Sequence, residues 1–202
     1  VLFKYKMLRL NIDYKDYGHF RWFFTSEGKL VIGGKNENQN EVVIKKFLKP
    51  NYSVAHTSKP GSPFMIIQTE NPSKQDIKET AVICACFSKQ WKSGNKKIEI
   101  DIFKGNQIFK KIGMKTGTFS VISERKKLSV KPELALVIQK GKLRAVPKGK
   151  IKEEVLVEIK PGKLSKEQAT EKIAKKIKDK FLLPISKEEI MQAIPSGNIY
   201  IK

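Results

Sequence analysis

The chain has 202 residues, 40% of them hydrophobic, and its longest uninterrupted apolar run, Ala81 to Phe87, is far shorter than the ~20 residues of a membrane-spanning helix. The sequence also has no signal-peptide pattern, so we expect a cytoplasmic protein of one domain with an appended element. Its 41 Lys and Arg against 20 Asp and Glu give a net charge of +21; because a heat-adapted surface would gain Glu along with Lys, this excess favours a polyanionic partner, nucleic acid before membrane.

The first quarter of the chain has the pattern of a strand, a hairpin and a helix. Leu2 to Ile12 is expected to be extended, and Arg21 to Gly34 to form a β-hairpin that turns at residues 26–28. Asn36 is then predicted to cap a helix, with Gln39 in capping-box spacing. This helix carries one apolar face before Pro50, which consists of Val43, Ile44, Phe47 and Leu48.

The middle of the chain is predicted to contain strands and one further helix. Residues 53–68 have the pattern strand, turn, strand, with a tight bend at Pro60 and Gly61. A helix is predicted from near Lys74 to Gln90, with an apolar stripe. Residues 96–105 alternate so that Ile98, Ile100 and Ile102 point one way, and residues 118–130 and 134–147 are predicted to form further strands.

A shift in composition after Pro147 marks a smaller C-terminal element. We expect a strand within residues 153–162, a helix with a capping box from Ser165 and Gln168, a short helix capped by Ser186, and a closing strand. The predicted fold class is α+β: a mixed, largely antiparallel sheet with two packed helices, plus a small C-terminal αβ element. The predicted division is residues 1–147 and 148–202.

The sequence offers few residues for catalysis or metal binding. Cys84 and Cys86 are interpreted as buried, free thiols of a reduced compartment. A zinc site would need two more ligands, and the only histidines are His19 and His56. We therefore expect no metal, no cofactor, no catalytic residue and no small-molecule substrate.

A glycine turn before the first helix raises the question of phosphate binding. The residues Gly33, Gly34 and Lys35 follow an apolar strand, but they match neither the phosphate-binding P-loop nor the dinucleotide-binding motif. Two interpretations stay open. The turn either presents an anion site at a helix start, assisted by Lys35, or is a plain turn whose glycines supply a positive φ.

Other basic stretches also allow a functional and a structural interpretation. Residues 88–97 place Lys89 and Lys92 beside Trp91, which either stacks a base or belongs to the core. His56, on a predicted strand, is either a hydrogen-bonded structural residue or a polyanion contact. Lysines act as mobile point charges, so they favour contacts to phosphate over reading of bases.

Four segments taken together resemble the RNA-binding module of the NFACT proteins, NFACT-R. They are "HFRWFFTSEGKLVIGGKNENQNEVVIKKFL", "VAHTSKPGSPFMII", "AVICACFSKQWK" and "IGMKTGTFSVISERKKLSV", in family order between Tyr17 and Val130. The chain looks like a short, stand-alone member that lacks the NFACT-N domain and the coiled coil, with its own C-terminal αβ element. It also departs from the family at Lys35 and Asn36, where members often have Arg-Asp, so a bidentate phosphate grip is not expected here.

The resemblance implies site residues and partners. By position it singles out Gly33, Gly34, Lys35, Asn40, Glu41, His56, Gly61, Ser62, Ser88, Lys89, Gly117 and Lys127. The predicted RNA-binding set adds the basic residues Arg21, Lys59, Lys92 and Lys115. Longer family members bind the large ribosomal subunit in ribosome quality control, so the implied partners are tRNA or rRNA and that subunit, without a membrane.

The predicted function is therefore non-catalytic binding of structured RNA in translation or ribosome-associated quality control. Two alternatives remain from other classes. One is an accessory subunit of an RNA-modifying enzyme, which would need a pocket with converging acids or histidines. The other is a protein-interaction module of the translation machinery that docks through the C-terminal element.

Overall fold

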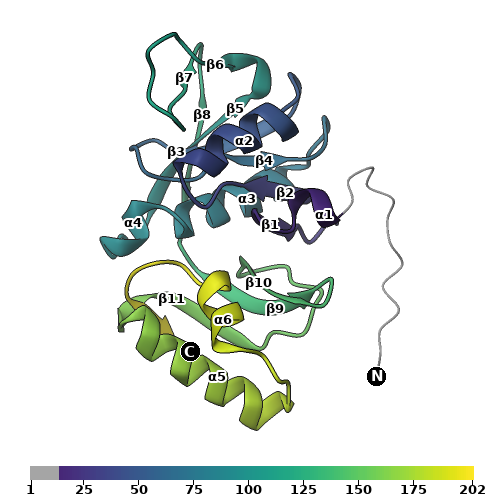
Figure 1. Cartoon of the computed structure of the whole chain (residues 1–202), viewed down its shortest axis with the longest axis vertical. Helices are drawn as coiled ribbons and strands as arrows, with labels where there is room; N and C mark the ends of the chain where they lie inside the picture. The colour runs from purple at the N-terminus through teal and green to yellow at the C-terminus, as the bar shows by residue number, and fades with distance from the viewer. Residues whose placement is uncertain (1–13) are drawn as a thin grey trace.

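The centre of the protein is a six-stranded sheet, as seen in a computed structural model that describes residues 14–202 (Figure 1). The strand order is β1-β2-β4-β3-β5-β8, and every neighbouring pair is antiparallel. The strands are β1 (Arg21–Phe24), β2 (Leu30–Gly33), β3 (Ser53–Thr57), β4 (Met65–Ile67), β5 (Ile98–Lys104) and β8 (Lys126–Val130). The hairpin predicted over residues 21–34 is confirmed, while the extended segment predicted for residues 2–12 lies outside the described residues.

The two faces of this sheet carry different helices. Side chains alternate along a strand, so on β2 Leu30 and Ile32 pack beneath helix α2 (Glu37–Phe47), while Val31 packs toward helix α3 (Lys74–Cys86). The short helix α1 (Tyr14–Tyr17) joins the aromatic core on the α2 side. The predicted α+β class with two packed helices is thus confirmed.

The single helix predicted between residues 74 and 90 is wrong in one respect, because it is broken into two. Helix α3 ends at Cys86, and Ser88 then caps a separate short helix, α4 (Lys89–Lys92), by accepting a hydrogen bond from the Gln90 N–H. Ser88 also donates to the Ala85 carbonyl, 2.7 Å away. A serine that satisfies groups on both sides of the break explains why the helix does not continue.

A second, four-stranded sheet lies against the other side of α3, in the lower half of Figure 1. Its order is β10-β9-β11-β12, again antiparallel, and its elements are β9 (Leu134–Gln139), β10 (Lys142–Pro147), β11 (Val157–Leu164), β12 (Ile199–Ile201), α5 (Lys166–Phe181) and α6 (Lys187–Ala193). The capping box of Ser165 and Gln168 and the cap at Ser186 are confirmed.

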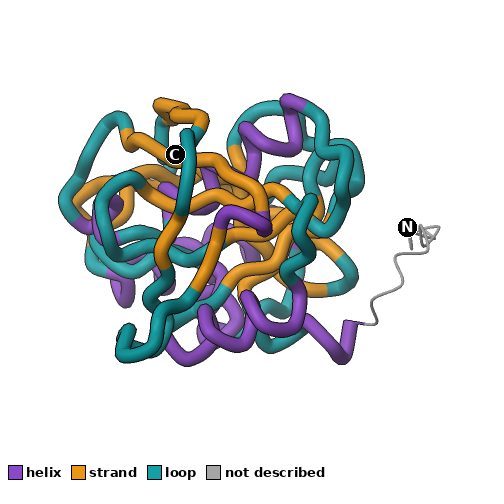
Figure 2. The backbone as a smooth tube through the Cα atoms, turned by 90° about the horizontal axis from the view of Figure 1, so that it is seen from above, coloured by secondary structure: helices purple, strands orange, loops and turns teal. Residues whose placement is uncertain are grey.

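The position of α3 between two sheets accounts for its composition. All residues from Glu79 to Cys86 are buried, and both cysteines are free, as expected. Burial raises the pKa of the Cys84 thiol to about 12. Figure 2 shows the strands running through the middle of the molecule, with helices and loops forming most of its outline.

One hydrophobic core continues from α3 into the second sheet. It includes Leu134, Leu136 and Leu143 together with Ile83 and Ile100. Strands β10 and β11, on either side of Pro147, belong to the same sheet. The division at residue 147 stays a prediction, and a cut there would pass through this sheet.

A small ribbon, β6 (Ile108–Phe109) and β7 (Ser120–Val121), follows the 3₁₀ turn Gly105–Gln107 and stands at the top of Figure 1. The segment between its strands reaches the start of α2, where the Gly117 N–H donates to the Glu41 carboxylate, 3.0 Å away. Among residues 14–202, no helix is long and apolar enough to cross a membrane.

Candidate functional site

An open cavity of about 710 Å³ lies where the turn after β2, the end of β3, helix α4 and the segment before β7 meet. Ten of the sixteen predicted site residues line it: Arg21, Gly34, Lys35, Asn40, His56, Gly61, Ser62, Lys89, Lys115 and Gly117. The other six, which do not line it, are Gly33, Glu41, Lys59, Ser88, Lys92 and Lys127. The fold therefore brings segments from four separate parts of the sequence into one concave surface.

The two glycines of the turn are required for space, not for a positive φ. Neither Gly33 nor Gly34 has a positive φ, which excludes a positive φ as the reason for the glycines in the second of the two open interpretations. A Cβ on Gly33 would lie 2.1 Å from Met65 Sδ, and one on Gly34 would lie 2.4 Å from Asn40 Oδ1. A side chain at Gly33 would force Met65 of β4 to move, and one at Gly34 would force the start of α2 to move.

The helix start beside the glycines is already partly satisfied from within the chain. Asn36 Oδ1 accepts from the Gln39 N–H at 2.9 Å, which confirms the predicted cap. Gln39 Oε1 in turn accepts from the Lys35 N–H at 3.0 Å, so that backbone donor is occupied. An anion here would therefore be bound chiefly by the Lys35 side chain, which is exposed.

Asn40 and Glu41, one turn into α2, hold the walls of the cavity. Asn40 is buried and its Oδ1 lies 3.4 Å from the Phe64 N–H. Glu41 accepts from Lys110 Nζ at 2.5 Å and from Gly117 N–H, and these two contacts, Lys110 first, lower its pKa to about 2. Both residues serve to fix the surrounding segments.

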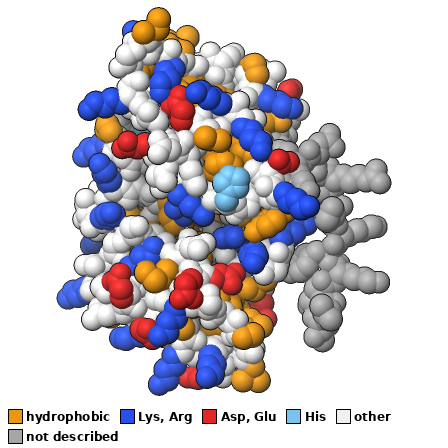
Figure 3. Space-filling view, in the orientation of Figure 1, with side chains coloured by type: hydrophobic (Ala, Val, Ile, Leu, Met, Phe, Trp, Pro, Cys, Tyr) orange, Lys and Arg blue, Asp and Glu red, His pale blue; other side chains and the backbone are white. Residues whose placement is uncertain are grey.

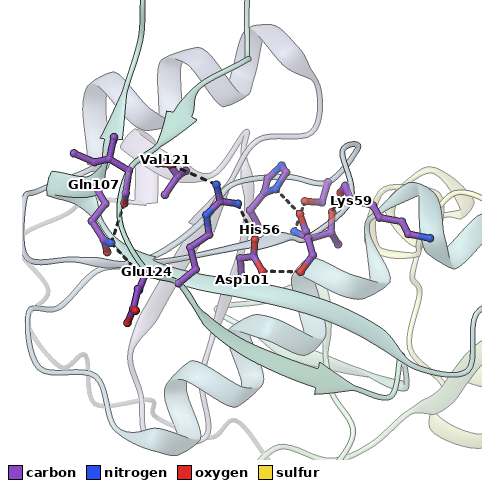
Figure 4. A network of polar contacts seen from close by, with 11 residues as sticks. His56, Lys59, Asp101, Gln107, Val121 and Glu124 are labelled. Carbon is purple, nitrogen blue, oxygen red and sulfur yellow. Dashed lines mark hydrogen bonds and ion pairs between the residues drawn. The ribbon is translucent and has the colours of Figure 1, made fainter.

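His56 lies in the wall of the cavity, in a polar network shown in Figure 4. Its Nδ1 is 2.8 Å from the Thr57 carbonyl, which only accepts, so Nδ1 carries the proton of the neutral ring and Nε2 is left as an acceptor. The ring packs on Phe64 with centroids 4.4 Å apart. Burial lowers the pKa of His56, so the ring is neutral at pH 7.

The same network contains residues that sequence reasoning did not include in the site. Asp101 is 4% exposed and accepts from Ser58 Oγ at 2.6 Å and from Arg125 Nη1 at 2.9 Å. Lys59 points away from the network in Figure 4. Strand β5 also carries Glu99 and Lys104, so no local pattern distinguished Asp101, and its partner Arg125 lies 24 positions later in the chain.

Two of the predicted residues support the rim, Gly61 through its backbone carbonyl and Ser62 through its side-chain Oγ. Gly61 has a φ of +106°, and a Cβ there would lie 2.6 Å from Lys89 Cδ. The Lys89 N–H also donates to the Gly61 carbonyl at 2.8 Å, which places the Lys89 side chain over the turn. Ser62 is buried and accepts from the Thr57 N–H at 2.9 Å.

The remaining predicted residues lie outside the cavity. Trp91, at 1% exposure, belongs to the core, so its structural interpretation is the correct one. Lys92 is exposed on α4, and Lys127 is exposed on β8 opposite Asp101 in the strand register.

The cavity carries an excess of positive charge. Two carboxylates line it, those of Glu37 and Asp101. Five cationic side chains also line it: Arg21, Lys35, Lys89, Lys115 and Arg125. Asp101 is ion-paired to Arg125. Figure 3 shows Lys and Arg spread over this face from top to bottom, with fewer acids among them. Among residues 14–202, no group of three or more His, Cys, Asp or Glu is placed to hold a metal.

Comparison with known families gives one match. The family model described as the NFACT protein RNA binding domain matches residues 19–123, just over half of the chain. Those residues include the whole lining of the cavity except Arg125.

Two curated relatives illustrate the extent of the similarity. The archaeal Rqc2 homolog aRqcH of Methanocaldococcus jannaschii is 28% identical over 206 residues, which cover 96% of this chain and 30% of that protein. The ribosome quality control complex subunit NEMF of Homo sapiens is 32% identical over 77 residues, which cover 36% of this chain and 7% of that protein. The chain thus spans less than a third of the length of these relatives.

The archaeal match also bears on the C-terminal element. At 96% coverage it includes most of residues 148–202, so that element is not peculiar to this chain, contrary to expectation. A solved structure of the C-terminal of the fibronectin/fibrinogen-binding protein from Streptococcus suis matches with a TM-score of 0.52 and 22% identity, covering 62% of this chain and 51% of that one. This likeness supports the fold alone.

Proposed function

Because the chain belongs to the family of NFACT protein RNA-binding domains, we propose that it binds structured RNA, tRNA or rRNA, through the cavity and the cations around it. The observation that carries this proposal is the convergence of five cationic side chains on one concave surface. The net charge of +21 adds a long-range attraction for polyanions.

The proposed contacts are mainly to phosphate. Lys35, Lys89 and Lys115 are exposed at the cavity and have no ion-pair partner among the described residues. A lysine ammonium is a mobile point charge, which suits phosphate oxygens better than base edges. Selection for structured RNA would then come from the shape of the cavity and the spacing of its cations.

We further propose that the chain acts without catalysis, in the setting of ribosome quality control and with the large ribosomal subunit as a partner. The names of the archaeal and human relatives motivate that setting. His56 is the one histidine in the cavity lining and its Nδ1 faces a backbone carbonyl, so the cavity offers no second histidine to share acid and base roles.

Fluorescence anisotropy with labelled RNA tests the proposal. The full chain is titrated with a tRNA, an rRNA fragment, a single-stranded RNA and a duplex DNA at several KCl concentrations. We expect the structured RNAs to bind best, with an affinity that falls by at least about tenfold between roughly 50 and 200 mM salt. A salt-independent response across the whole panel would overturn the proposal.

A charge reversal locates the site. Changing Lys35 and Lys89 together to Glu should weaken RNA binding while leaving the melting temperature nearly unchanged, because both side chains are exposed. The matched control reverses Lys172 and Lys175, two exposed lysines on α5 that lie outside the cavity lining. Equal losses in the two double variants would mean that net charge alone, and not this cavity, binds the RNA.

A further inference from the structure

Two arginines lie close together where strand β1 of the first sheet meets strand β10 of the second, a contact that we call the seam. Arg21, on β1, lies over the Phe87 ring with its guanidinium carbon 3.5 Å from the ring centroid. Arg144, on β10 of the second sheet, lies over the Trp22 ring at 4.2 Å. Both arginines and Lys35 line a small cavity of about 20 Å³ between β1 and β10. In Figure 3, blue side chains cross the middle of this face, near the level of the seam.

The charge of these cations is only partly compensated within the described part of the chain. Arg21, Lys35 and Arg144 form no ion pair among residues 14–202, and the Nε atoms of both arginines are buried without a hydrogen-bond partner. Tyr14 forms a side-chain hydrogen bond with Arg144, and the Glu189 carboxylate, which also accepts from the Leu143 N–H at 2.8 Å, attracts Arg144 through its charge without forming an ion pair with it. Buried donors on a charged group are costly to leave unpaired.

The cations also repel one another. Burial and the neighbouring Arg144 lower the pKa of Arg21 to about 9. The pKa of Lys35 is lowered by partial burial and then by Arg21 and Arg144, although its side chain as a whole remains exposed. Folding therefore gathers like charges at the seam, and a bound anion would relieve that repulsion.

Lys166 and Lys92 add to the positive charge that acts around Arg21. Lys166 is the first residue of α5, and its pKa is lowered by burial, by Arg21 and by Lys92 of α4, while Glu167 opposes the shift. The α5 cap itself is filled, because Ser165 and Gln168 satisfy each other's backbone N–H groups. The attraction for an anion here would come from side chains and not from the helix end.

We propose that Arg21, Lys35 and Arg144, with Lys166 and Lys92 beside them, form a seam site that binds a phosphodiester group of the RNA next to the one held in the large cavity. The small cavity holds about one water, so the phosphate must approach from the large cavity, which Arg21 and Lys35 also line. Arginine suits this role because its planar guanidinium matches phosphate geometry. The proposal rests on the proposed function.

The seam site gives the second sheet and its helices a role in RNA binding. Arg144 and Lys166 both belong to the second sheet and its helices, outside the residues matched by the family model. The second sheet and its helices would thus extend the basic surface beyond the residues matched by the family model. A purely structural role, in which each arginine only covers an aromatic ring, predicts no effect on the salt dependence of RNA binding.

The test compares three single variants of the full chain: Arg144→Gln, Lys166→Gln and, as the matched control, Lys175→Gln further along α5. We expect the first two to raise the Kd for RNA roughly threefold to tenfold and to reduce the slope of log K against log salt by about one for a direct contact. Lys175→Gln should change the Kd by less than about twofold. Arg144→Lys, which keeps the charge, should retain part of the affinity.

A second measurement follows the melting temperature with inorganic tripolyphosphate against KCl of equal ionic strength. The wild type should be stabilised by tripolyphosphate, and Arg144→Gln should lose much of that shift. If the seam variants bind RNA like Lys175→Gln while the Lys35 and Lys89 charge reversal abolishes binding, the seam site is overturned and the proposed function stands. If the wild type binds no RNA, the proposed function fails. If tripolyphosphate then also raises the melting temperature of the wild type and of Arg144→Gln equally, the seam site is overturned as well.

Discussion

The Glu41 carboxylate on α2 accepts a hydrogen bond from the Gly117 N–H, 3.0 Å away and 76 positions later in the chain. The same carboxylate pairs with Lys110 and Lys45. One acid therefore ties the segment between β6 and β7 to the helix that begins at the cavity. Its position implies that this acid supports RNA binding even though its charge opposes it.

Replacing Glu41 with Gln should weaken RNA binding and lower the free energy of unfolding by about 1 kcal/mol. Because the folded pKa is about 2, below the ordinary 4.5, the contribution of Glu41 is present above pH 4.5 and is lost as pH falls toward 2. The variant should therefore lose stability less steeply in that window. The control is Glu37→Gln, an exposed acid on the same helix; if both variants tighten RNA binding equally, Glu41 acts only as a charge.

The buried pair Asp101 and Arg125 gives a second prediction. Arg125→Gln leaves the carboxylate of Asp101 unpaired at 4% exposure, so we expect a loss of about 1–3 kcal/mol, moderated by the partial exposure of Arg125. The uncovered negative charge should also weaken RNA binding. Adding Asp101→Asn to Arg125→Gln should restore much of the lost stability and much of the lost RNA affinity. A double-mutant cycle measures the first by denaturant unfolding and the second by fluorescence anisotropy. Strictly additive effects of the two changes would contradict the coupling.

Local features of this fold were predictable from the sequence, whereas long-range ones were not. The cap at Asn36, the capping box at Ser165 and the hairpin turn at residues 26–28 each depend on residues within four positions of one another. Asp101 on β5 pairs with Arg125, which lies 24 positions later, and Arg144 on the second sheet lies near Arg21 on the first. Contacts between residues so far apart in the sequence cannot be predicted from local sequence patterns.

The glycine turn shows the same limit at the site itself. The sequence indicated that glycine is needed at positions 33 and 34. It could not distinguish between two physical reasons for a glycine, a positive φ and the close approach of another segment. Only the folded positions of Met65 on β4 and Asn40 on α2 decide between them. Likewise, the apolar run from Ala81 to Phe87 indicated burial without revealing that a second sheet covers it.

Replacing Gly34 with Ala should disturb the start of α2. The new Cβ would lie 2.4 Å from Asn40 Oδ1 and 2.5 Å from Asn40 N, so the helix must shift. We expect a loss of about 2 kcal/mol and a weakened affinity for RNA. Gly94→Ala is the control, since its φ is +70° but nothing lies near its Cβ; it should cost about 1 kcal/mol and leave RNA binding unchanged. Wild-type affinity in Gly34→Ala would show that the turn is not part of the site.

Truncation after Pro147 should yield a chain that does not unfold cooperatively. The cut removes β11, which pairs with β9, and it uncovers apolar residues of β9 such as Leu134 and Leu136. The side chain of Gln139 on β9 also bonds both backbone groups of Phe24 on β1, so the loss would reach the first sheet. Circular dichroism during heating measures this. A sharp melt together with wild-type RNA affinity would instead establish residues 1–147 as an independent domain.

The pH dependence of RNA binding should depend on His56. Burial holds its pKa below the ordinary 6.5, so its neutral form stabilises the fold above pH 6.5 and that stability is lost as pH falls through the lower folded pKa. A bound phosphate would favour the charged ring, so the Kd for RNA should tighten between about pH 7.5 and 5.5, where phosphodiesters stay ionised. His56→Gln should remove this tightening, whereas His19→Gln, at the exposed other histidine, should keep it. Fluorescence anisotropy at pH 7.5 and pH 5.5 measures the Kd for RNA of each variant. The same change of Kd with pH in both variants would exclude His56 from the RNA-binding surface.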